Sequence, residues 1–346
     1  MIGLTTLAAL LRFYGLGHQG FWFDEANTAL LVHFSPGKML GLIPQTESTP
    51  PLYYCVAWLW ARAFGYGEAG LRSLSALAGV LTVPLAYGAG AKLVSRRAGV
   101  IVAALCACNP FLIWYSQEAR SYALLVLLST ASLLAFAYTL ERPTARSAAS
   151  WVIASGLALA THYYALLVVL PEALWLLAAH RRSRQAQVGV GLVGLCGLAL
   201  VPLAISQNGT GRGNWIAHAP LGRRVAQLAP QFVIGFGSPA YAVLEPLALA
   251  IAIFALVLLV TRSGGERQGA LVAGALALGG LAINLVLIAG GVDDLITRNV
   301  LVIWMLAGLV IAAGLAAARA RLAGLGAAIA LCAVSYTHLR AHETGR

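Results

Sequence analysis

Charged residues are what this sequence has least of. Only 10% of its 346 residues are charged and 60% are apolar, and the mean hydropathy is +0.81. A soluble domain carries roughly 25% charged residues, so the composition excludes an ordinary soluble protein and predicts a chain that crosses a membrane many times. Residues 1–11 also lack a basic segment and a small-residue cleavage site, so no cleavable signal peptide is evident.

The sequence also lacks the spacing of His, Cys and carboxylate residues that would establish a metal site. The five cysteines all fall in apolar segments and are expected to be small core residues. His338 and His342 have a spacing that suits a metal on a helix, but they lie in 335–346, which resembles a translated cloning scar. We expect 335–346 to be a non-native tail. Residues 1–334 are then a single transmembrane domain, truncated at its C-terminus, whose first helix could be truncated as well.

Positive charge lies between the apolar runs and is not gathered in one patch. The net charge of +11 comes from residues in short loops, which indicates membrane topology and no nucleic-acid partner. A spanning helix needs about 20 apolar residues. Eleven runs meet or approach this length: 1–16, 71–91, 98–114, 122–140, 148–161, 163–179, 188–206, 241–261, 269–290, 299–318 and 322–334. A further run, 51–64, is shorter and dense in aromatic residues, so we expect an interfacial helix there.

The distribution of arginines predicts which side each loop faces. If 51–64 does not span, the basic loops around Arg97, Arg182 and Arg319 all fall on one side, which the positive-inside rule makes cytoplasmic. The protein is then a multi-pass protein of the inner (cytoplasmic) membrane. Eight acids fall on the outer face: Asp24, Glu25, Glu47, Glu68, Glu118, Glu245, Asp293 and Asp294. An active site is therefore expected on the outer face.

Three of these acids differ from the rest in their surroundings. Asp24, Glu25 and Glu118 are each embedded in aromatic residues at a helix end. Partial desolvation there raises the pKa of a carboxylate toward values useful for a general base. We expect three other glutamates of this face to be solvated loop residues: Glu47, Glu68 and Glu245.

Basic and aromatic residues accompany the acids at the outer helix ends. Arg72, Arg120 and Arg298 could reach lipid headgroups or hold a phosphate through paired N–H donors. His162, between two short spans, could be a hydrogen-bonded core residue or part of a site. Pro50 and Pro51 fix an extended entry into the next helix.

Five stretches in order resemble a known family. "WFDEA", "TPPLYY", "LRSLSAL", "WYSQEARSYALL" and "THYY" are similar to the bacterial membrane glycosyltransferases of the protein-O-mannosyltransferase and aminoarabinose-transferase superfamily. The resemblance covers about residues 10–180, and "ITRNVL" later in the chain fits less specifically. It implies the GT-C fold, which is an all-α polytopic membrane bundle, here of about eleven transmembrane helices plus an interfacial helix in the first outer loop.

The resemblance also implies a reaction. The donor would be a sugar on a polyprenyl phosphate, and the acceptor a hydroxyl of a glycan, lipid or protein beside the bilayer. The catalytic residues would be Asp24 as general base, Glu25 orienting the acceptor, and Glu118, which could position an arginine or hold a divalent metal as in some relatives. No cofactor is certain. Relatives often carry a basic residue before the double proline, where it contacts the donor phosphate. Thr49 stands there in this chain, so the contact is expected to pass to an arginine.

The predicted substrate-binding residues share a place at the outer helix ends. They are Trp22, Pro51, Tyr53, Tyr54, Arg72, Tyr115, Gln117, Arg120, Tyr122, His162, Tyr163 and Arg298. The alternative function is a membrane transporter or flippase for lipid-linked sugars, for which Glu172, deep in a span after Pro171, is the best residue. A polysaccharide polymerase or ligase is a further rival, favoured by a large outer loop, and 207–240 is moderate in length. The sequence names neither the sugar nor the acceptor.

Overall fold

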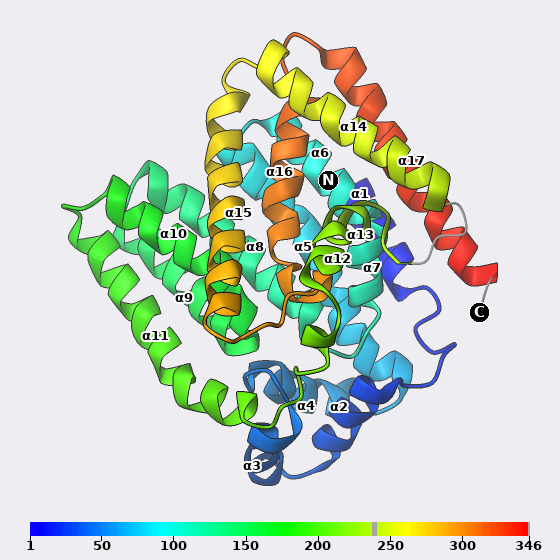
Figure 1. Ribbon diagram of the computed structural model, residues 1–346, viewed down its shortest axis with the longest axis vertical. Coiled ribbons are helices and arrows are strands. Elements are labelled where there is room, and N and C mark those ends of the chain that lie inside the picture. The colour runs from blue at the N-terminus through cyan, green and yellow to red at the C-terminus, as the bar shows by residue number, and fades with distance from the viewer. Residues whose placement is uncertain (237–240, 345–346) are drawn as a thin grey trace.

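The computed structural model describes residues 1–236 and 241–344, and in these residues it contains helices and no strand (Figure 1). The α-helices are α1 (Ile2–Phe13), α2 (Phe23–His33), α3 (Pro36–Thr46), α4 (Leu52–Phe64), α5 (Glu68–Leu93), α6 (Arg96–Cys108), α7 (Pro110–Ser116), α8 (Tyr122–Glu141), α9 (Ala145–Thr161), α10 (Leu166–Ala179), α11 (Arg184–Asn208), α12 (Leu221–Ala226), α13 (Leu228–Ile234), α14 (Tyr241–Arg262), α15 (Glu266–Ala289), α16 (Ile303–Leu315) and α17 (Arg321–Thr344). Three short 3-10 helices lie at Tyr163–Ala165, Ile216–His218 and Thr297–Val300.

Ten of the eleven predicted spans each overlap one α-helix, 98–114 is divided between α6 and α7, and the number of helices that cross a membrane is confirmed in part. Within the described residues, five helices are long and apolar enough to span, or six if the bent pair α6 and α7 is one span. Four shorter apolar helices account for 1–16, 163–179, 299–318 and 322–334, whereas α9, which covers the predicted span 148–161, belongs to neither group. The fold is therefore an all-α polytopic membrane fold.

The bend between α6 and α7 follows from two residues. Pro110 has no N–H to continue α6, and it occupies the first turn of α7, where a proline is tolerated. Asn109 caps α7 by accepting a hydrogen bond from Leu112 N at 3.0 Å. The two helices meet at 59°, so the single predicted span 98–114 is broken near its end.

Several helices begin at a capping residue in the basic loops. Ser95, Thr144 and Ser183 each accept a hydrogen bond from a backbone N–H in the first turn of α6, α9 and α11. Such caps satisfy donors that a helix start leaves free. In these three loops, which are predicted to be cytoplasmic, the cap fixes the residue at which the next helix begins.

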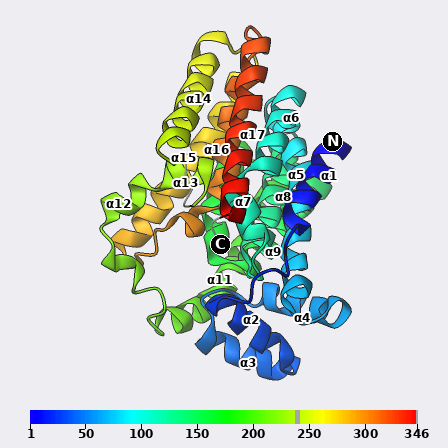
Figure 2. The same cartoon turned by 90° about the vertical axis from the view of Figure 1, so that its right-hand side faces the viewer.

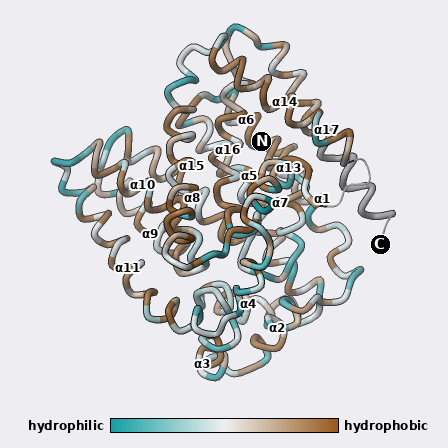
Figure 3. The backbone as a smooth tube through the Cα atoms, in the orientation of Figure 1, coloured by the Kyte–Doolittle hydropathy of each residue, from teal (hydrophilic) through white to brown (hydrophobic). Residues whose placement is uncertain are grey.

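The spans differ in how much of their surface the bundle covers. Leu192, Leu195 and Leu198 of α11 are exposed, as are Ile253 and Val257 of α14, and hydrophobic residues recur along both helices (Figure 3). Elsewhere small residues allow close packing, because a Cβ at Gly280 of α15 would lie 2.3 Å from the Leu167 carbonyl oxygen of α10. The exposed apolar faces suit contact with lipid.

Helices α2, α3 and α4 form a separate layer at one end of the bundle, which we call the α2–α4 end (Figures 1 and 2). Their buried core includes Leu31, Met39 and Tyr54. The C-terminus of α11 reaches this layer, since Gln207 Nε2 donates to the Ile43 carbonyl of α3 at 3.3 Å. The 13-residue helix α4 matches the helix expected over 51–64, and its place in the interface stays a prediction.

The far end of the chain continues as helix. α17 runs through Thr344 into the segment predicted to be a non-native tail. The side chains of His338 and His342 lie outside the described residues. The division into 1–334 and 335–346 therefore stays a prediction.

Candidate active site at the α2–α4 end

Asp24 and Glu25 stand in the first turn of α2, and the structure separates their roles. Glu25 is 1% exposed. Its Oε1 accepts from Arg72 Nε at 2.8 Å and from Ala119 N at 2.7 Å, and its Oε2 accepts from Arg72 Nη2 at 2.6 Å and from Trp22 N at 3.3 Å. Both oxygens of Glu25 are thus engaged with the protein, which argues against direct contact with an acceptor.

Arg72 is equally engaged. Beyond Glu25, its guanidinium donates to the carbonyls of Leu16, Gln19 and Gly20 at 2.7 to 3.0 Å. The five N–H groups of an arginine are all accounted for by these bonds. The geometry therefore argues against the prediction that Arg72 holds a phosphate. It fixes the α1–α2 connection instead.

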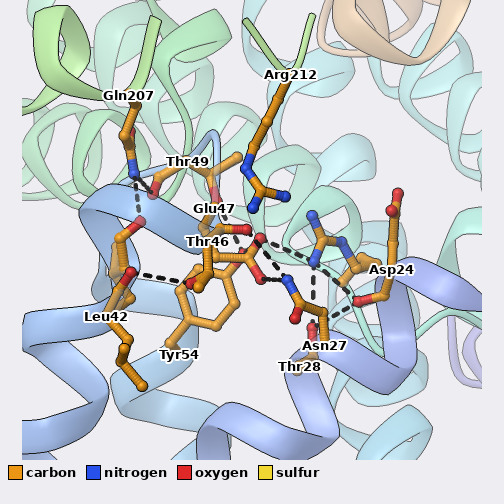
Figure 4. A network of polar contacts seen from close by, with 12 residues as sticks. Asp24, Asn27, Thr28, Leu42, Thr46, Glu47, Thr49, Tyr54, Gln207 and Arg212 are labelled. Carbon is orange, nitrogen blue, oxygen red and sulfur yellow. Dashed lines mark hydrogen bonds and ion pairs between the residues drawn. The ribbon is translucent and has the colours of Figure 1, made fainter. Parts of the chain in front are cut away.

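A second buried ion pair joins Arg120 to Glu47 at 3.0 Å (Figure 4). Arg120 Nη1 also donates to the Asp24 carbonyl at 3.1 Å. Glu47 additionally accepts from Tyr54 and from Asn27. Glu47 is 2% exposed, so the expectation that it is a solvated loop residue is wrong. The ion pair with Arg120 and the surrounding donors compensate the burial of its charge.

The Asp24 side chain is the open part of the site. In Figure 4 its carboxylate points away from the Glu47–Arg120 network. It is 29% exposed and lies 4.0 Å from Arg298 Nη1. Within residues 1–236 and 241–344 the Asp24 carboxylate accepts no hydrogen bond. The Nε of Arg298 is buried and has no partner in the described part of the chain. Asp24 and Arg298 therefore keep bonding capacity for a ligand.

Glu118 lies in the turn between α7 and α8. Its Oε1 accepts from Trp114 Nε1 at 2.7 Å, and its buried Oε2 has no partner among the described residues. Burial raises the pKa of Glu118 to about 7, partly opposed by the Trp114 hydrogen bond. A carboxyl group near its pKa at neutral pH can exchange a proton with a ligand.

Aromatic rings and a histidine form the wall beside Arg298. The ring of Tyr122 lies 4.9 Å from that of Tyr115 and 5.8 Å from that of His162. Burial, together with the charges of Arg120 and Arg298, lowers the pKa of His162 to about 3, so its imidazole is neutral. Nδ1 of His162 accepts from Tyr164 N at 3.2 Å. This corresponds to the core-residue interpretation of His162, beside the candidate site.

Four other residues predicted to bind substrate are bonded or buried within the protein, and among them the buried Tyr53 hydroxyl has no partner in the described residues. Gln117 Nε2 donates to the Tyr14 carbonyl at 2.9 Å. The hydroxyl of Tyr163 donates to Gln207 Oε1 at 2.6 Å, and Tyr53 and Tyr54 are buried in α4. Pro51 precedes α4 as its N-cap, and Trp22 is 40% exposed at the start of α2. Of these six, Trp22 is the most exposed.

The sequence analysis missed the contribution of residues 209–236, which we call the loop segment. Arg212 Nε and Nη2 donate to the Gln45 carbonyl at 3.2 and 3.0 Å, and Arg224 forms a two-pronged ion pair with Asp293 at 2.7 Å. The ring of Trp215 lies 5.5 Å from the Arg298 guanidinium. No local motif marks these residues, because their partners lie far away in sequence.

The acids near this segment have opposite pKa shifts. The hydrogen bonds from Arg224 lower the pKa of Asp293. Burial raises the pKa of Asp294, although a hydrogen bond with Tyr164 opposes the shift. Asp293 thus anchors the loop segment, and burial makes Asp294 take up a proton more readily than Asp293 does.

The site does not show a metal-binding geometry. In the part of the chain that the structure describes, no three His, Cys, Asp or Glu residues gather closely enough to hold a metal ion. Asp24 and Glu118 are the acids with free oxygens beside Arg298. These residues do not make up a three-ligand site, and no step proposed below passes through a metal.

Comparison with known proteins decides the fold. Residues 48–205 match the family model described as dolichyl-phosphate-mannose-protein mannosyltransferase. The structure resembles ArnT from Cupriavidus metallidurans bound to undecaprenyl phosphate, with a TM-score of 0.65, 16% identity, and coverage of 95% of this chain and 62% of that one. The chain has the GT-C fold. The expected glycosyltransferase resemblance and the all-α polytopic class are thereby confirmed.

Further GT-C structures agree. The oligosaccharyltransferase of Archaeoglobus fulgidus in complex with Zn and sulfate matches with a TM-score of 0.54 and 16% identity, covering 98% of this chain and 52% of that chain. The same enzyme tethered to an acceptor peptide matches with a TM-score of 0.53 and 13% identity, covering 98% and 54%. The chain spans about three fifths of the ArnT length. No curated protein matches this chain in sequence.

Proposed function

We propose that this chain transfers a sugar from a polyprenyl-phosphate-linked donor to an acceptor hydroxyl, with Asp24 as the general base. The observation that carries the proposal is the pair formed by Asp24 and Arg298 at 4.0 Å. One group can take a proton and the other can hold an anion, and both keep free bonding capacity. The binding of undecaprenyl phosphate by ArnT, which shares the fold, supports a donor of this class.

The reaction follows from these two groups. Asp24 takes the proton of the acceptor hydroxyl, whose oxygen attacks the anomeric carbon of the sugar. The bond between that carbon and the phosphate oxygen breaks, and polyprenyl phosphate leaves with the bonding electrons. Arg298 stabilises the negative charge that develops on the phosphate. Partial burial of both groups strengthens their interaction with the transition state.

The buried ion pairs have a positioning role in this proposal. Arg72 and Ala119 N hold Glu25, and Arg120 Nη1 donates to the Asp24 carbonyl at 3.1 Å. These bonds fix the first turn of α2 and hence the direction of the Asp24 side chain. We assign Glu25, Glu47 and Arg120 to positioning, and Glu118 to exchange of a proton or orientation of the acceptor.

The proposal places the site on the outer face of the cytoplasmic membrane. The basic loops, which the positive-inside rule assigns to the cytoplasm, are joined to the α2–α4 end by helices such as α11. The α2–α4 end then faces outward, where a glycan, lipid or protein acceptor could approach.

Single-turnover transfer from a radiolabelled polyprenyl-phosphate sugar tests the general base. Asp24→Asn keeps the side-chain shape but removes its basicity, so transfer should fall about 10²–10⁴-fold while donor binding stays near wild type. Glu68→Gln is the matched control, because Glu68 is a partly exposed acid in the first turn of α5. Wild-type transfer by Asp24→Asn would end the assignment.

A further inference from the structure

The arginines of the α2–α4 end differ in the donors that remain for a ligand. Arg72 has its donors engaged by Glu25 and backbone carbonyls. Arg224 is held by Asp293 and two carbonyls. Arg120 is 8% exposed and its Nη1 is bonded to Glu47, although its buried Nε has no partner in the described residues. Of these five arginines, Arg298 and Arg212 are the two whose side chains are open to solvent. Arg298 has a buried Nε without a partner in the described residues, and Arg212 is exposed, with Nε and Nη2 bonded to one carbonyl.

The described ion pairs leave one arginine of this region without an acidic partner. Glu25, Glu47 and Asp293 each neutralise one of the three engaged arginines. Asp24 then faces Arg298, which leaves Arg212 without a counter-charge among the described ion pairs.

The fold fixes where Arg212 stands. On one side its guanidinium is tied to the Gln45 carbonyl at the end of α3, and in Figure 4 it lies beside Glu47 and Thr49. On the other side a Cβ at Gly213 would lie 2.5 Å from Asp294 Oδ1, so the backbone beside Arg212 packs closely against the Asp294 side chain. Gly211 has φ +69°, which favours glycine. Arg212 therefore sits on a backbone that is fixed between the two walls of the site.

We propose that Arg212 is a second ligand of the donor phosphate and acts with Arg298 on the leaving group. Trp215, three residues after Arg212, contacts the Arg298 guanidinium, so the loop segment presents Arg212 to the same side of the site. This inference rests on the proposed function and names a residue that the sequence motifs do not include.

The chemistry of the donor gives a reason for two arginines. A sugar phosphodiester carries one negative charge, whereas the phosphate monoester that leaves carries up to two. When the bond from the anomeric carbon to the phosphate oxygen breaks, the electron pair stays on that oxygen. Before transfer, Arg298 and Arg212 together balance the charges of Asp24 and the diester. When Asp24 takes the proton of the acceptor, the second negative charge develops on the leaving phosphate, and Arg212 becomes more strongly engaged. An interaction that strengthens in this way lowers the barrier for transfer.

Binding of undecaprenyl phosphate and of uncharged undecaprenol to the purified full chain tests the inference. Arg212→Ala should weaken binding of the phosphate lipid about tenfold, the lower end for a charged hydrogen bond because Arg212 is exposed. Binding of undecaprenol should not change. Arg212→Lys should restore part of the loss, because lysine keeps the charge without the planar fork. Arg223→Ala is the matched control, since Arg223 is an exposed arginine of the same loop segment.

Three outcomes separate the inference from the proposed function. If wild type prefers undecaprenyl phosphate and Arg212→Ala keeps that preference unchanged, the role of Arg212 is wrong and the donor class stands. If wild type binds undecaprenyl phosphate no better than undecaprenol, the donor class itself fails, and the role of Arg212 fails with it. An equal loss for both lipids in Arg212→Ala would point to a structural role of Arg212 and overturn its phosphate role.

Discussion

Asp24 and Glu25 are adjacent in sequence but have different surroundings. Neighbours in an α-helix point about 100° apart, so one side chain of the first turn of α2 enters the protein while the other stays at the open site. Glu25 meets Arg72 and Ala119 N, whereas Asp24 meets Arg298 at 4.0 Å. The motif predicted that both acids belong to the site. The fold shows that Glu25 is held by the protein, whereas Asp24 is free to contact a ligand.

Glu25→Gln should therefore destabilise the protein more than Asp24→Asn does. Removing the charge of Glu25 leaves the buried Arg72 guanidinium without its counter-ion, and breaking such a pair costs about 3–5 kcal/mol. Asp24 is 29% exposed, so its neutral variant should cost less than about 1 kcal/mol. Thermal unfolding in detergent measures the difference. Equal melting temperatures for the two variants would contradict the division of roles.

Glu118 gives the protein a pH-dependent stability. Its pKa is raised by burial to about 7 from an ordinary value near 4.5. A raised pKa means that the folded state binds the proton more tightly, so the contribution is complete below about pH 4.5 and is lost as the pH rises to about 7. Relative to Glu118→Gln, wild type should lose up to about 3 kcal/mol of stability over that interval. Denaturation of both proteins at several pH values checks it, and a constant difference would refute it.

The buried and distant partners were beyond sequence reasoning at the residue scale. Glu47 and Arg120 are 73 residues apart, and Arg212 and Gln45 are 167 residues apart. A local motif states which side chains are available but not which of them meet. The sequence therefore predicted that Glu47 is a solvated loop residue, although it is 2% exposed. Arg212 was not among the predicted site residues.

Among the elements, hydrophobic runs predicted the helices well because each span must be apolar over its length. All eleven predicted runs fall on helices of the structure. The break between α6 and α7 was not predicted, because Asn109 and Pro110 lie inside an apolar run and act through capping and a missing N–H. The packing of the loop segment was also not predictable, since it depends on contacts with α3 and with residues 293–298.

Helices α8, α9 and α10 are joined by a polar cluster inside the bundle. Glu172 Oε2 accepts from Ser132 at 2.5 Å and from Trp151 Nε1 at 2.9 Å, and Ser132 also bonds Ser155 at 2.8 Å. Glu172 is the residue that best suited a transporter. Within the bundle it serves as an acceptor that joins three helices.

Two variants of Glu172 separate these interpretations. Glu172→Gln keeps an oxygen for Ser132 and Trp151, so the melting temperature and sugar transfer should stay close to wild type. Glu172→Leu leaves both donors unpaired, which costs about 1–3 kcal/mol for each buried group, and should lower the melting temperature while any residual folded protein transfers sugar. Loss of function in a stable Glu172→Gln protein would instead favour a role of Glu172 in transport.

At the scale of the whole molecule, the orientation in the membrane decides whether the proposed reaction is feasible, because the lipid-linked donor and the acceptor must both reach Asp24. Lys38 is exposed on α3 at the α2–α4 end, and Arg182 is exposed in the basic loop before α11. The 25 residues of α11 separate the two positions, about 37 Å of helix, which is enough to cross the hydrocarbon core.

In a background without the five native cysteines, Lys38→Cys should react with an impermeant thiol reagent in intact cells. Arg182→Cys should react only after the cells are made permeable. The reverse pattern would place the α2–α4 end in the cytoplasm and contradict the outward site, whereas labelling of both positions in intact cells would show that α11 does not span.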